Sequence, residues 1–220
     1  MARIRNTARL FRDPAFALAL SELDKEVTRG GVFRVDPEGW FSRPAPLEVE
    51  IGAGKGDFIV AWARAHTAHN FLALELGGSA FHWLMRAVID AGLPNLRALH
   101  ADARSVVNLM LPAASVAAFH IYFPDPWPKN RHQRHRLFSP AFVAGLARCL
   151  QSDGIVYLAT DVQAYFCVLS KLMEEGGFEL VQRPGTDDLR GTFGRKFERA
   201  GRPIFRACYA RKVANFVPHK

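Results

Sequence analysis

The sequence predicts an α/β fold with one mostly parallel sheet and an antiparallel hairpin at its C-terminal edge. Three observations lead to this prediction. Short apolar runs rich in β-favouring residues alternate with stretches long enough for helices. The first run ends in a glycine-rich turn, and the last two follow each other without an obvious helix between them. Such alternation is typical of parallel sheets that carry crossover helices on their faces.

Length and composition favour a single domain. The chain has 220 residues, of which 49% are hydrophobic, enough for one substantial core. Its formal net charge of +8 predicts a polyanionic partner, with a merely basic enzyme as the alternative. No run, including AFALAL at 15–20, approaches the roughly 18 apolar residues of a membrane span. Three cysteines without C-x-x-C spacing favour a reducing cytoplasm.

The N-terminal part is expected to lie outside the core. A Pro-containing segment at 36–46 divides the chain into a basic N-terminal extension, residues 1–46, and a folded domain, residues 47–220. The extension starts with a basic bias that mitochondrial transit peptides share, but acidic residues soon follow. A nucleic-acid-contacting arm or a solvated tail is therefore the better interpretation.

Six runs are predicted to form the parallel sheet and its last strand. They are LEVEI (47–51), FLALEL (71–76), LRALHA (96–101), AAFHIYF (117–123), GIVYLAT (154–160) and IFRACYA (204–210). The run FELVQ (178–182) comes just before the last of these without an obvious helix between. We expect these final two runs to pair as the antiparallel edge hairpin.

The first strand runs into a turn that suits a bound ligand. Gly52, Gly54 and Gly56 follow Ile51, and a helix can begin near Phe58. Glycines at a strand-to-helix turn let the backbone approach a ligand closely. A plain tight turn is the alternative. A Walker loop is excluded, because Gly54 and Lys55 are followed by Gly rather than by Ser or Thr.

Two further strands end in carboxylates. Glu75 lies about 21 positions beyond Gly54, where doubly wound folds place an acid that accepts hydrogen bonds from ribose hydroxyls. Asp102 follows the third strand, in a position to lie near an adenine, unless it is an isolated surface acid. Because the carboxyl ends of parallel strands share one edge, these groups predict a nucleoside-binding crevice.

Glu50 decides between two kinds of cofactor. A dinucleotide fits the same crevice, which keeps an oxidoreductase as an alternative. A carboxylate one residue before the glycine turn region would repel a pyrophosphate and suits a ligand with a cationic amino acid end. The sequence therefore predicts S-adenosylmethionine as the cofactor. In the competing interpretation, Glu50 only caps local backbone amides.

The segment after the fourth strand carries a family resemblance. FPDPWPKNRHQRHR (123–136) resembles the signature of the transfer RNA guanine-N7 methyltransferase family. The stretches VEIGAGKGDF, ALEL, GLPNLRALHADA and YLATD resemble the same family, so that the resemblance covers roughly 47–211. It implies a Rossmann-like S-adenosylmethionine-dependent methyltransferase fold, and methylation of N7 of guanine in tRNA, at position 46 of the variable loop.

The resemblance also implies roles for individual residues. Asp125 is implied as the catalytic residue, next to a cofactor-binding set of Glu50, Gly52, Gly54, Glu75, Asp102 and Asp125 itself. The implied substrate-binding positions are Lys129, Asp161, Arg195, Lys196, Phe197 and Glu198. Within this last group, Arg195 replaces a threonine of the family's T-K-F-E motif, which puts the local hydrogen bonding in question.

The chemistry of guanine N7 agrees with these roles. The nitrogen already offers an in-plane lone pair, so that catalysis needs alignment and charge stabilisation rather than a strong base. Asp125 is expected to position the guanine and stabilise its developing charge. Asp161 or Glu198 can accept hydrogen bonds from N1 and N2, which would exclude adenine. Trp127 either stacks on the base or packs the loop.

The cations beside this loop predict RNA contacts. Lys129 is followed by Arg131, Arg134 and Arg136, which suit phosphates unless they form a solvated face. The pair His132 and His135 supports a metal site only weakly, and we expect no metal. We expect a cytoplasmic monomer or homodimer without an obligate protein partner. An enzyme for another substrate, or a catalytically weak RNA-binding module, are the alternatives.

Overall fold

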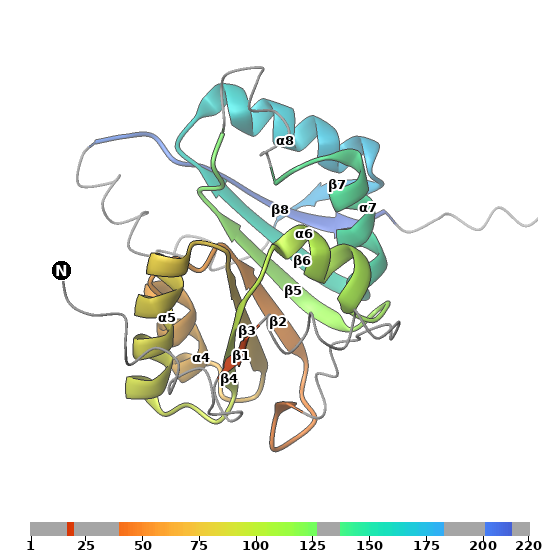
Figure 1. Cartoon of the computed structure of the whole chain (residues 1–220). Coiled ribbons are helices and arrows are strands. Elements are labelled where there is room, and N and C mark those ends of the chain that lie inside the picture. The colour runs from red at the N-terminus through yellow and green to blue at the C-terminus, as the bar shows by residue number, and fades with distance from the viewer. Residues whose placement is uncertain (1–16, 20–39, 127–136, 183–200, 213–220) are drawn as a thin grey trace, which may run out of the picture.

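The computed structural model describes residues 17–19, 40–126, 137–182 and 201–212. Within these residues one eight-stranded sheet carries helices on both faces (Figure 1). The strands are β1 (Ala17–Ala19), β2 (Leu47–Ile51), β3 (Asn70–Glu75), β4 (Leu96–His100), β5 (Val116–Tyr122), β6 (Leu150–Thr160), β7 (Phe178–Val181) and β8 (Phe205–Arg211). The helices are α4 (Asp57–Ala65), α5 (Gly78–Ala91), α6 (Ala103–Ser105), the π-helical turn η2 (Val106–Met110), α7 (Pro140–Cys149) and α8 (Gln163–Glu175).

The sheet has the order β1-β4-β3-β2-β5-β6-β8-β7. Neighbouring strands from β1 to β6 pair in parallel, whereas β8 is antiparallel to both β6 and β7. All six runs predicted as strands form strands, and the edge hairpin forms between the two final runs. The fold class predicted from the sequence is therefore confirmed.

Strand β1 was not predicted. Its three residues pair in parallel with β4, with Ala17 opposite Ala98, and so extend the sheet at the edge distant from β7. A run this short carries no usable alternation of apolar and polar residues. The segment expected as an extension therefore contributes a strand to the sheet, while the division at residue 46 stays a prediction.

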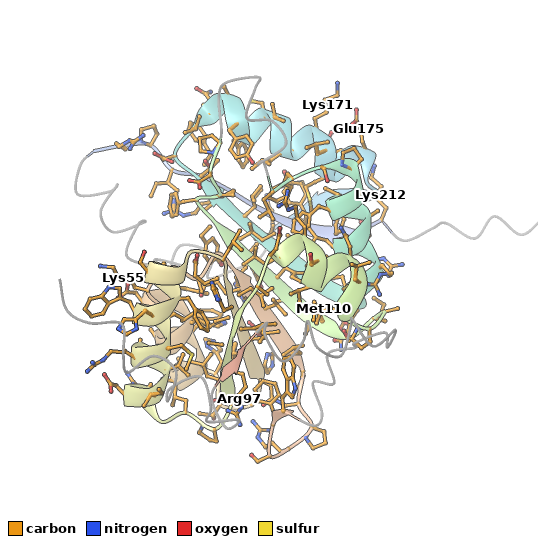
Figure 2. The ribbon with its side chains drawn as sticks, viewed as in Figure 1. Lys55, Arg97, Met110, Lys171, Glu175 and Lys212 are labelled. Carbon is orange, nitrogen blue, oxygen red and sulfur yellow. The ribbon has the colours of Figure 1, made fainter. Side chains whose placement is uncertain are left out.

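Two apolar layers cover the sheet. Helices α4 and α5 pack Phe58, Ile59, Phe81 and Leu84 on one face, whereas η2, α7 and α8 cover the other. Figure 1 shows these helix groups on opposite sides of the strands. Charged side chains lie on the outer surface, as the Lys171 and Glu175 pair on α8 illustrates (Figure 2). The site is thus framed by a rigid, close-packed core.

Strand β2 departs from this apolar pattern on one face. All five of its residues are buried, and successive side chains point to opposite faces of a sheet. Leu47, Val49 and Ile51 join the core under η2, α7 and α8. Glu48 therefore points to the α4 side, where it contacts Trp62 of that helix, and Glu50 shares this face. Two buried carboxylates thus lie beneath α4.

Among the described residues, no helix is long and apolar enough to cross a membrane. Helix α5, with 14 residues, is shorter than the roughly 20 residues that span a bilayer.

Candidate functional site

The predicted acids meet at one edge of the sheet. Strands β2 to β6 run parallel, so that their carboxyl ends point the same way. The glycine turn follows β2, Glu75 ends β3, and Asp102, Asp125 and Asp161 follow β4, β5 and β6. Ligands of open α/β sheets bind at this edge. The strand-end prediction is therefore correct in its geometry.

The glycine turn is built on left-handed backbone. Gly52, Gly54 and Gly56 have φ values of 75°, 58° and 86°, which residues with side chains rarely adopt. The backbone N–H groups of Gly52 and Ala53 both donate to Leu74 O, at 2.9 and 3.0 Å. A Cβ atom at Gly52 would meet no atom within 4 Å. The turn is tight and leaves open space at Gly52.

Glu75 braces this turn. Its Oε2 accepts the Gly54 N–H at 2.8 Å, and its Oε1 accepts the Gly77 N–H at 2.6 Å, just before α5. The sequence did not predict this role, because it depends on the pairing of β3 with β2. Each carboxylate oxygen can accept more than one hydrogen bond, so that the predicted contact with ribose hydroxyls stays compatible.

Lys55 extends from the same turn over an aromatic ring. Its Nζ lies 5.7 Å from the ring centroid of Trp83 on α5, at the side of the molecule labelled in Figure 2. Trp83 is 55% exposed. This cation–π contact packs the glycine turn against α5 from the solvent side.

Glu50 is buried and only partly satisfied. Its residue is 4% exposed, and its Oε2 has no hydrogen-bond partner within the described parts of the chain. Burial raises the pKa of Glu50 to about 8, the carboxylates of Glu75 and Asp57 raise it further, and a hydrogen bond from the Ile59 backbone opposes the increase. The local cap that we considered exists at Ile59, yet one oxygen stays unpartnered. Such a buried polar atom is costly and marks a functional position.

Asp102 is paired rather than isolated. Its Oδ1 accepts the Arg104 backbone N–H at 2.9 Å and caps α6, while the Arg104 guanidinium approaches Oδ2 to 2.6 Å. The side-chain hydrogen bonds from Arg104 lower the pKa of Asp102 below its ordinary value, against a smaller opposing effect of burial. The alternative of an isolated surface acid is therefore wrong, and its contact with adenine stays a prediction.

Asp125 lies exposed beyond a strained residue. Phe123, directly after β5, has a φ of 52°, and its backbone N–H donates to Ala159 O at 2.7 Å. A bulky residue with positive φ costs on the order of 1 to 3 kcal/mol and persists only where its surroundings hold it. This strained turn directs the chain out of the sheet, and the carboxylate of Asp125 lies two residues further on.

Asp161 forms an ion pair across the sheet edge. Its Oδ2 lies 2.5 Å from Nη2 of Arg202, and its side chain is 12% exposed. Arg202 precedes β8, which is antiparallel to β6. The sequence did not predict this partner. A guanine held by Asp161 would have to share the carboxylate with Arg202.

The remaining predicted positions lie outside the described residues. These are Trp127, Lys129, Arg131, His132, Arg134, His135, Arg136, Arg195, Lys196, Phe197 and Glu198. Their roles stay predictions.

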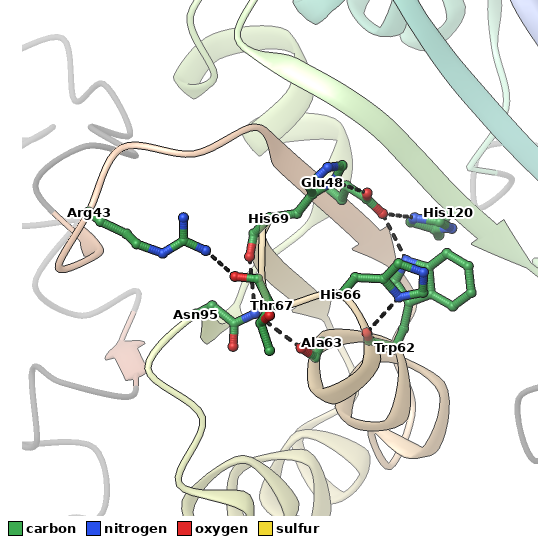
Figure 3. A network of polar contacts seen from close by, with 9 residues as sticks. All are labelled: Arg43, Glu48, Trp62, Ala63, His66, Thr67, His69, Asn95 and His120. Atoms are coloured by element: carbon green, nitrogen blue, oxygen red, sulfur yellow. Dashed lines mark hydrogen bonds and ion pairs between the residues drawn. The ribbon is translucent and has the colours of Figure 1, made fainter.

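A buried polar network next to Glu50 was missed by the sequence analysis. The Glu48 carboxylate accepts hydrogen bonds from Trp62 Nε1 at 2.9 Å, His69 Nδ1 at 2.5 Å and His120 Nε2 at 2.7 Å. Figure 3 shows Glu48 between the two histidines. A Glu within LEVEI and a His within AAFHIYF, both polar residues inside buried strands, were the available signal. His66 instead contacts the Trp62 carbonyl oxygen.

This network predicts a specific acid sensitivity. Burial by itself would raise the pKa of Glu48, but hydrogen bonds from His120, Trp62 and His69 outweigh it and lower the pKa from 4.5 to about 2. A depressed carboxyl pKa stabilises the fold above the unfolded-state value and loses that contribution as the pH falls through the folded-state value. We therefore expect stability to fall between pH 4.5 and about 2.

Urea unfolding at several pH values across that window tests this expectation. Glu48→Gln should be less stable than the wild type at neutral pH, and should lose less stability on acidification. Equal losses in both proteins would contradict the assignment.

Comparisons with known proteins bear on the class of protein. A family model described as "Putative methyltransferase" matches residues 44–207. A tRNA (guanine-N(7)-)-methyltransferase of Leifsonia xyli subsp. xyli is 39% identical over 178 residues, covering 78% of this chain and 78% of the relative. The protein of that name from Levilactobacillus brevis is 36% identical over 186 residues, covering 78% and 86%.

Solved structures share the fold at lower identity. The 16S rRNA methyltransferase KamB has a TM-score of 0.58 and 17% identity, with 80% of this chain and 92% of that chain covered. A SAM-dependent methyltransferase from Aquifex aeolicus has a TM-score of 0.54 and 12% identity, with 94% and 98% covered.

The parallel sheet, the glycine turn and the acids at the strand ends define a Rossmann-like methyltransferase of the S-adenosylmethionine-dependent class. The family match decides against the oxidoreductase alternative. The chain belongs to the tRNA (guanine-N7-)-methyltransferase family. The resemblance found in the sequence is therefore confirmed.

Proposed function

We propose that the protein transfers a methyl group from S-adenosylmethionine to N7 of a guanine in tRNA, at position 46 of the variable loop. One observation carries the proposal. The unpartnered oxygen of buried Glu50 lies beside a left-handed glycine turn at the ligand-binding edge of a parallel sheet. A cationic amino acid end satisfies such a carboxylate, whereas a pyrophosphate does not.

The residues at the strand ends fit the cofactor. Glu50 would accept a hydrogen bond from its ammonium group, which gives the orphaned oxygen a partner. The open space at Gly52 lets the ligand approach the backbone, and Gly54 lies in the same turn. Glu75 would hold the ribose hydroxyls with its remaining lone pairs, and Asp102 would lie near the adenine.

The reaction needs alignment more than proton transfer. S-adenosylmethionine supplies a methyl group on a positively charged sulfur, and guanine N7 offers a lone pair to it. Asp125 would position the guanine and counter the positive charge that develops on the purine. Asp161 or Glu198 would accept from guanine N1 and N2, so that adenine would leave a carboxylate unpaired.

Basic residues would bind the tRNA. Phosphate contacts are assigned to Arg131, Arg134 and Arg136, and contacts with the target nucleotide to Lys129, Arg195, Lys196, Phe197 and Glu198. The net charge of +8 favours association by release of counterions. We propose that the enzyme acts in the cytoplasm as a monomer or homodimer, without an obligate protein partner.

Methyl transfer from labelled S-adenosylmethionine to unmodified tRNA tests this function. Mass spectrometry of the nucleosides should find 7-methylguanosine, and analysis of nuclease fragments should place it at position 46. A tRNA with adenine at that position serves as the control and should accept no label. Cofactor binding without methylation of tRNA would contradict the proposed substrate, and label elsewhere in the tRNA would contradict the proposed position.

A further inference from the structure

Both ring nitrogens of a buried histidine are occupied next to the cofactor carboxylate. His120 on β5 is fully buried. Its Nε2 lies 2.7 Å from Glu48 Oε2, and its Nδ1 lies 2.8 Å from the hydroxyl of Tyr122. The Tyr157 ring stacks on the imidazole, with centroids 5.0 Å apart and an angle of 8°, and Phe58 packs at 5.2 Å. The imidazole is therefore held in one orientation.

Glu50 is the direct cross-strand neighbour of this histidine. In the ladder between β2 and β5, Glu50 pairs with His120. Glu48 and Glu50 are two residues apart on β2 and share the face beneath α4. The histidine thus has two candidate carboxylate partners. It bonds to Glu48, and Oε2 of Glu50 stays without a partner within the described parts of the chain.

The partners of His120 have matching hydrogen-bond polarity. Glu48 is a carboxylate at neutral pH, since hydrogen bonds lower its pKa to about 2 despite burial, so that His120 Nε2 donates to it. Burial raises the pKa of Tyr122 well above its ordinary value, so that its hydroxyl keeps a hydrogen to donate to Nδ1. One acceptor and one donor therefore select a single tautomer of the ring.

We propose that Glu48 and Tyr122 are positioning residues for the cofactor site: by engaging both nitrogens of His120, they hold its imidazole away from Glu50 and keep that carboxylate available for the ammonium group of the cofactor. The inference rests on the proposed role of Glu50 in binding the cofactor. Without the Tyr122 hydroxyl, Nδ1 lacks a partner, and the Glu50 carboxylate is the unsatisfied acceptor opposite it in the sheet. An imidazole paired with Glu50 would compete with the cofactor.

Tyr122→Phe is the least disruptive test, because it removes one hydroxyl and keeps the ring that packs edge-on against Phe58. We expect the KM for S-adenosylmethionine and the Kd for S-adenosylhomocysteine to rise about tenfold, with kcat at saturating cofactor changed less than about twofold. Tyr209→Phe is the matched control, since its hydroxyl donates to Ser170 Oγ at 2.9 Å, on the face covered by α8. It should lower thermal stability without changing KM.

A second substitution distinguishes positioning from packing. In Tyr122→Phe combined with His120→Gln, the Gln amide still offers a donor to Glu48 but no imidazole remains to pair with Glu50. We expect the KM for the cofactor to return to within about threefold of the wild-type value. A double variant that binds the cofactor as weakly as Tyr122→Phe, or a Tyr122→Phe variant with the wild-type KM, would overturn the inference.

Glu50→Gln, measured in the same assay, separates this inference from the proposed function. Weak cofactor binding in Glu50→Gln together with normal binding in Tyr122→Phe overturns the inference alone. Normal binding in Glu50→Gln overturns the role of Glu50 and the inference that rests on it.

Discussion

Asp125→Ala is expected to lower kcat for methyl transfer about 100- to 1000-fold, because it removes the negative charge proposed to face the purine as its positive charge develops. The carboxylate lies exposed at the carboxyl edge of the sheet, two residues beyond the strained Phe123. Its effect should fall mainly on kcat, since the proposed cofactor contacts at Glu50 and Glu75 stay in place. Single-turnover kinetics with saturating tRNA and cofactor measure this step directly.

Two variants sharpen the result. Asp125→Asn keeps the size and one acceptor oxygen, so that its residual activity separates positioning from charge. Asp153→Ala removes another exposed acid, near the amino end of β6 and thus away from the ligand-binding edge, and should leave kcat unchanged. Near-normal turnover in Asp125→Ala would remove the catalytic assignment.

Glu50→Gln is expected to weaken cofactor binding about 10- to 100-fold and to abolish a proton release that accompanies binding. Burial, with the neighbouring Glu75 and Asp57, raises the pKa of Glu50 to about 8, so that the free protein holds a proton there at pH 7. A cationic ligand favours the carboxylate and expels this proton. Cofactor affinity should therefore rise as the pH rises toward 8.

Calorimetry in two buffers with different ionisation enthalpies measures the released proton. At pH 7 the wild type should release up to about one proton per cofactor bound, and Glu50→Gln should release close to none. Equal release by both proteins would show that another group titrates. Asp57→Asn, which removes a neighbouring charge and not the proposed contact, is the control and should retain most of the release.

The same pKa shift has a consequence for stability without cofactor. A raised carboxyl pKa stabilises the fold fully below the unfolded-state value of 4.5 and loses that contribution as the pH rises through the folded-state value of about 8. Glu48 acts in the opposite direction below pH 4.5. The two carboxylates on one face of β2 thus oppose each other, because one is satisfied by protein hydrogen bonds and the other is not.

Much of the fold could be predicted because strands and their ends leave local signals. LEVEI forms β2 with the predicted bounds, since five buried residues stop at a glycine turn. Strand β6 begins at Leu150, four residues before the predicted GIVYLAT, because a register shift opposite Val116 and Ala118 accommodates the extra residues. Strand β1 was missed since its pairing with β4 joins segments about 80 residues apart.

The candidate site divides in the same way. The sequence by itself determined the family, the glycine turn and the acids at the strand ends, because parallel strands bring their carboxyl ends to one edge. Only the tertiary structure decided the partner of each acid: Arg104 for Asp102, Arg202 for Asp161, and backbone N–H groups for Glu75. These contacts depend on where each side chain and turn lies in the folded sheet.

The contrast between Glu48 and Glu50 states the physical reason most directly. Both are glutamates in one buried run, and nothing in that run separates a structural carboxylate from a ligand-binding one. The strand order places β5 beside β2, so that His120 reaches Glu48 across 72 positions of sequence and leaves an oxygen of Glu50 unpaired. Local pattern determines where a strand lies and ends, and long-range pairing determines which of its polar groups is satisfied.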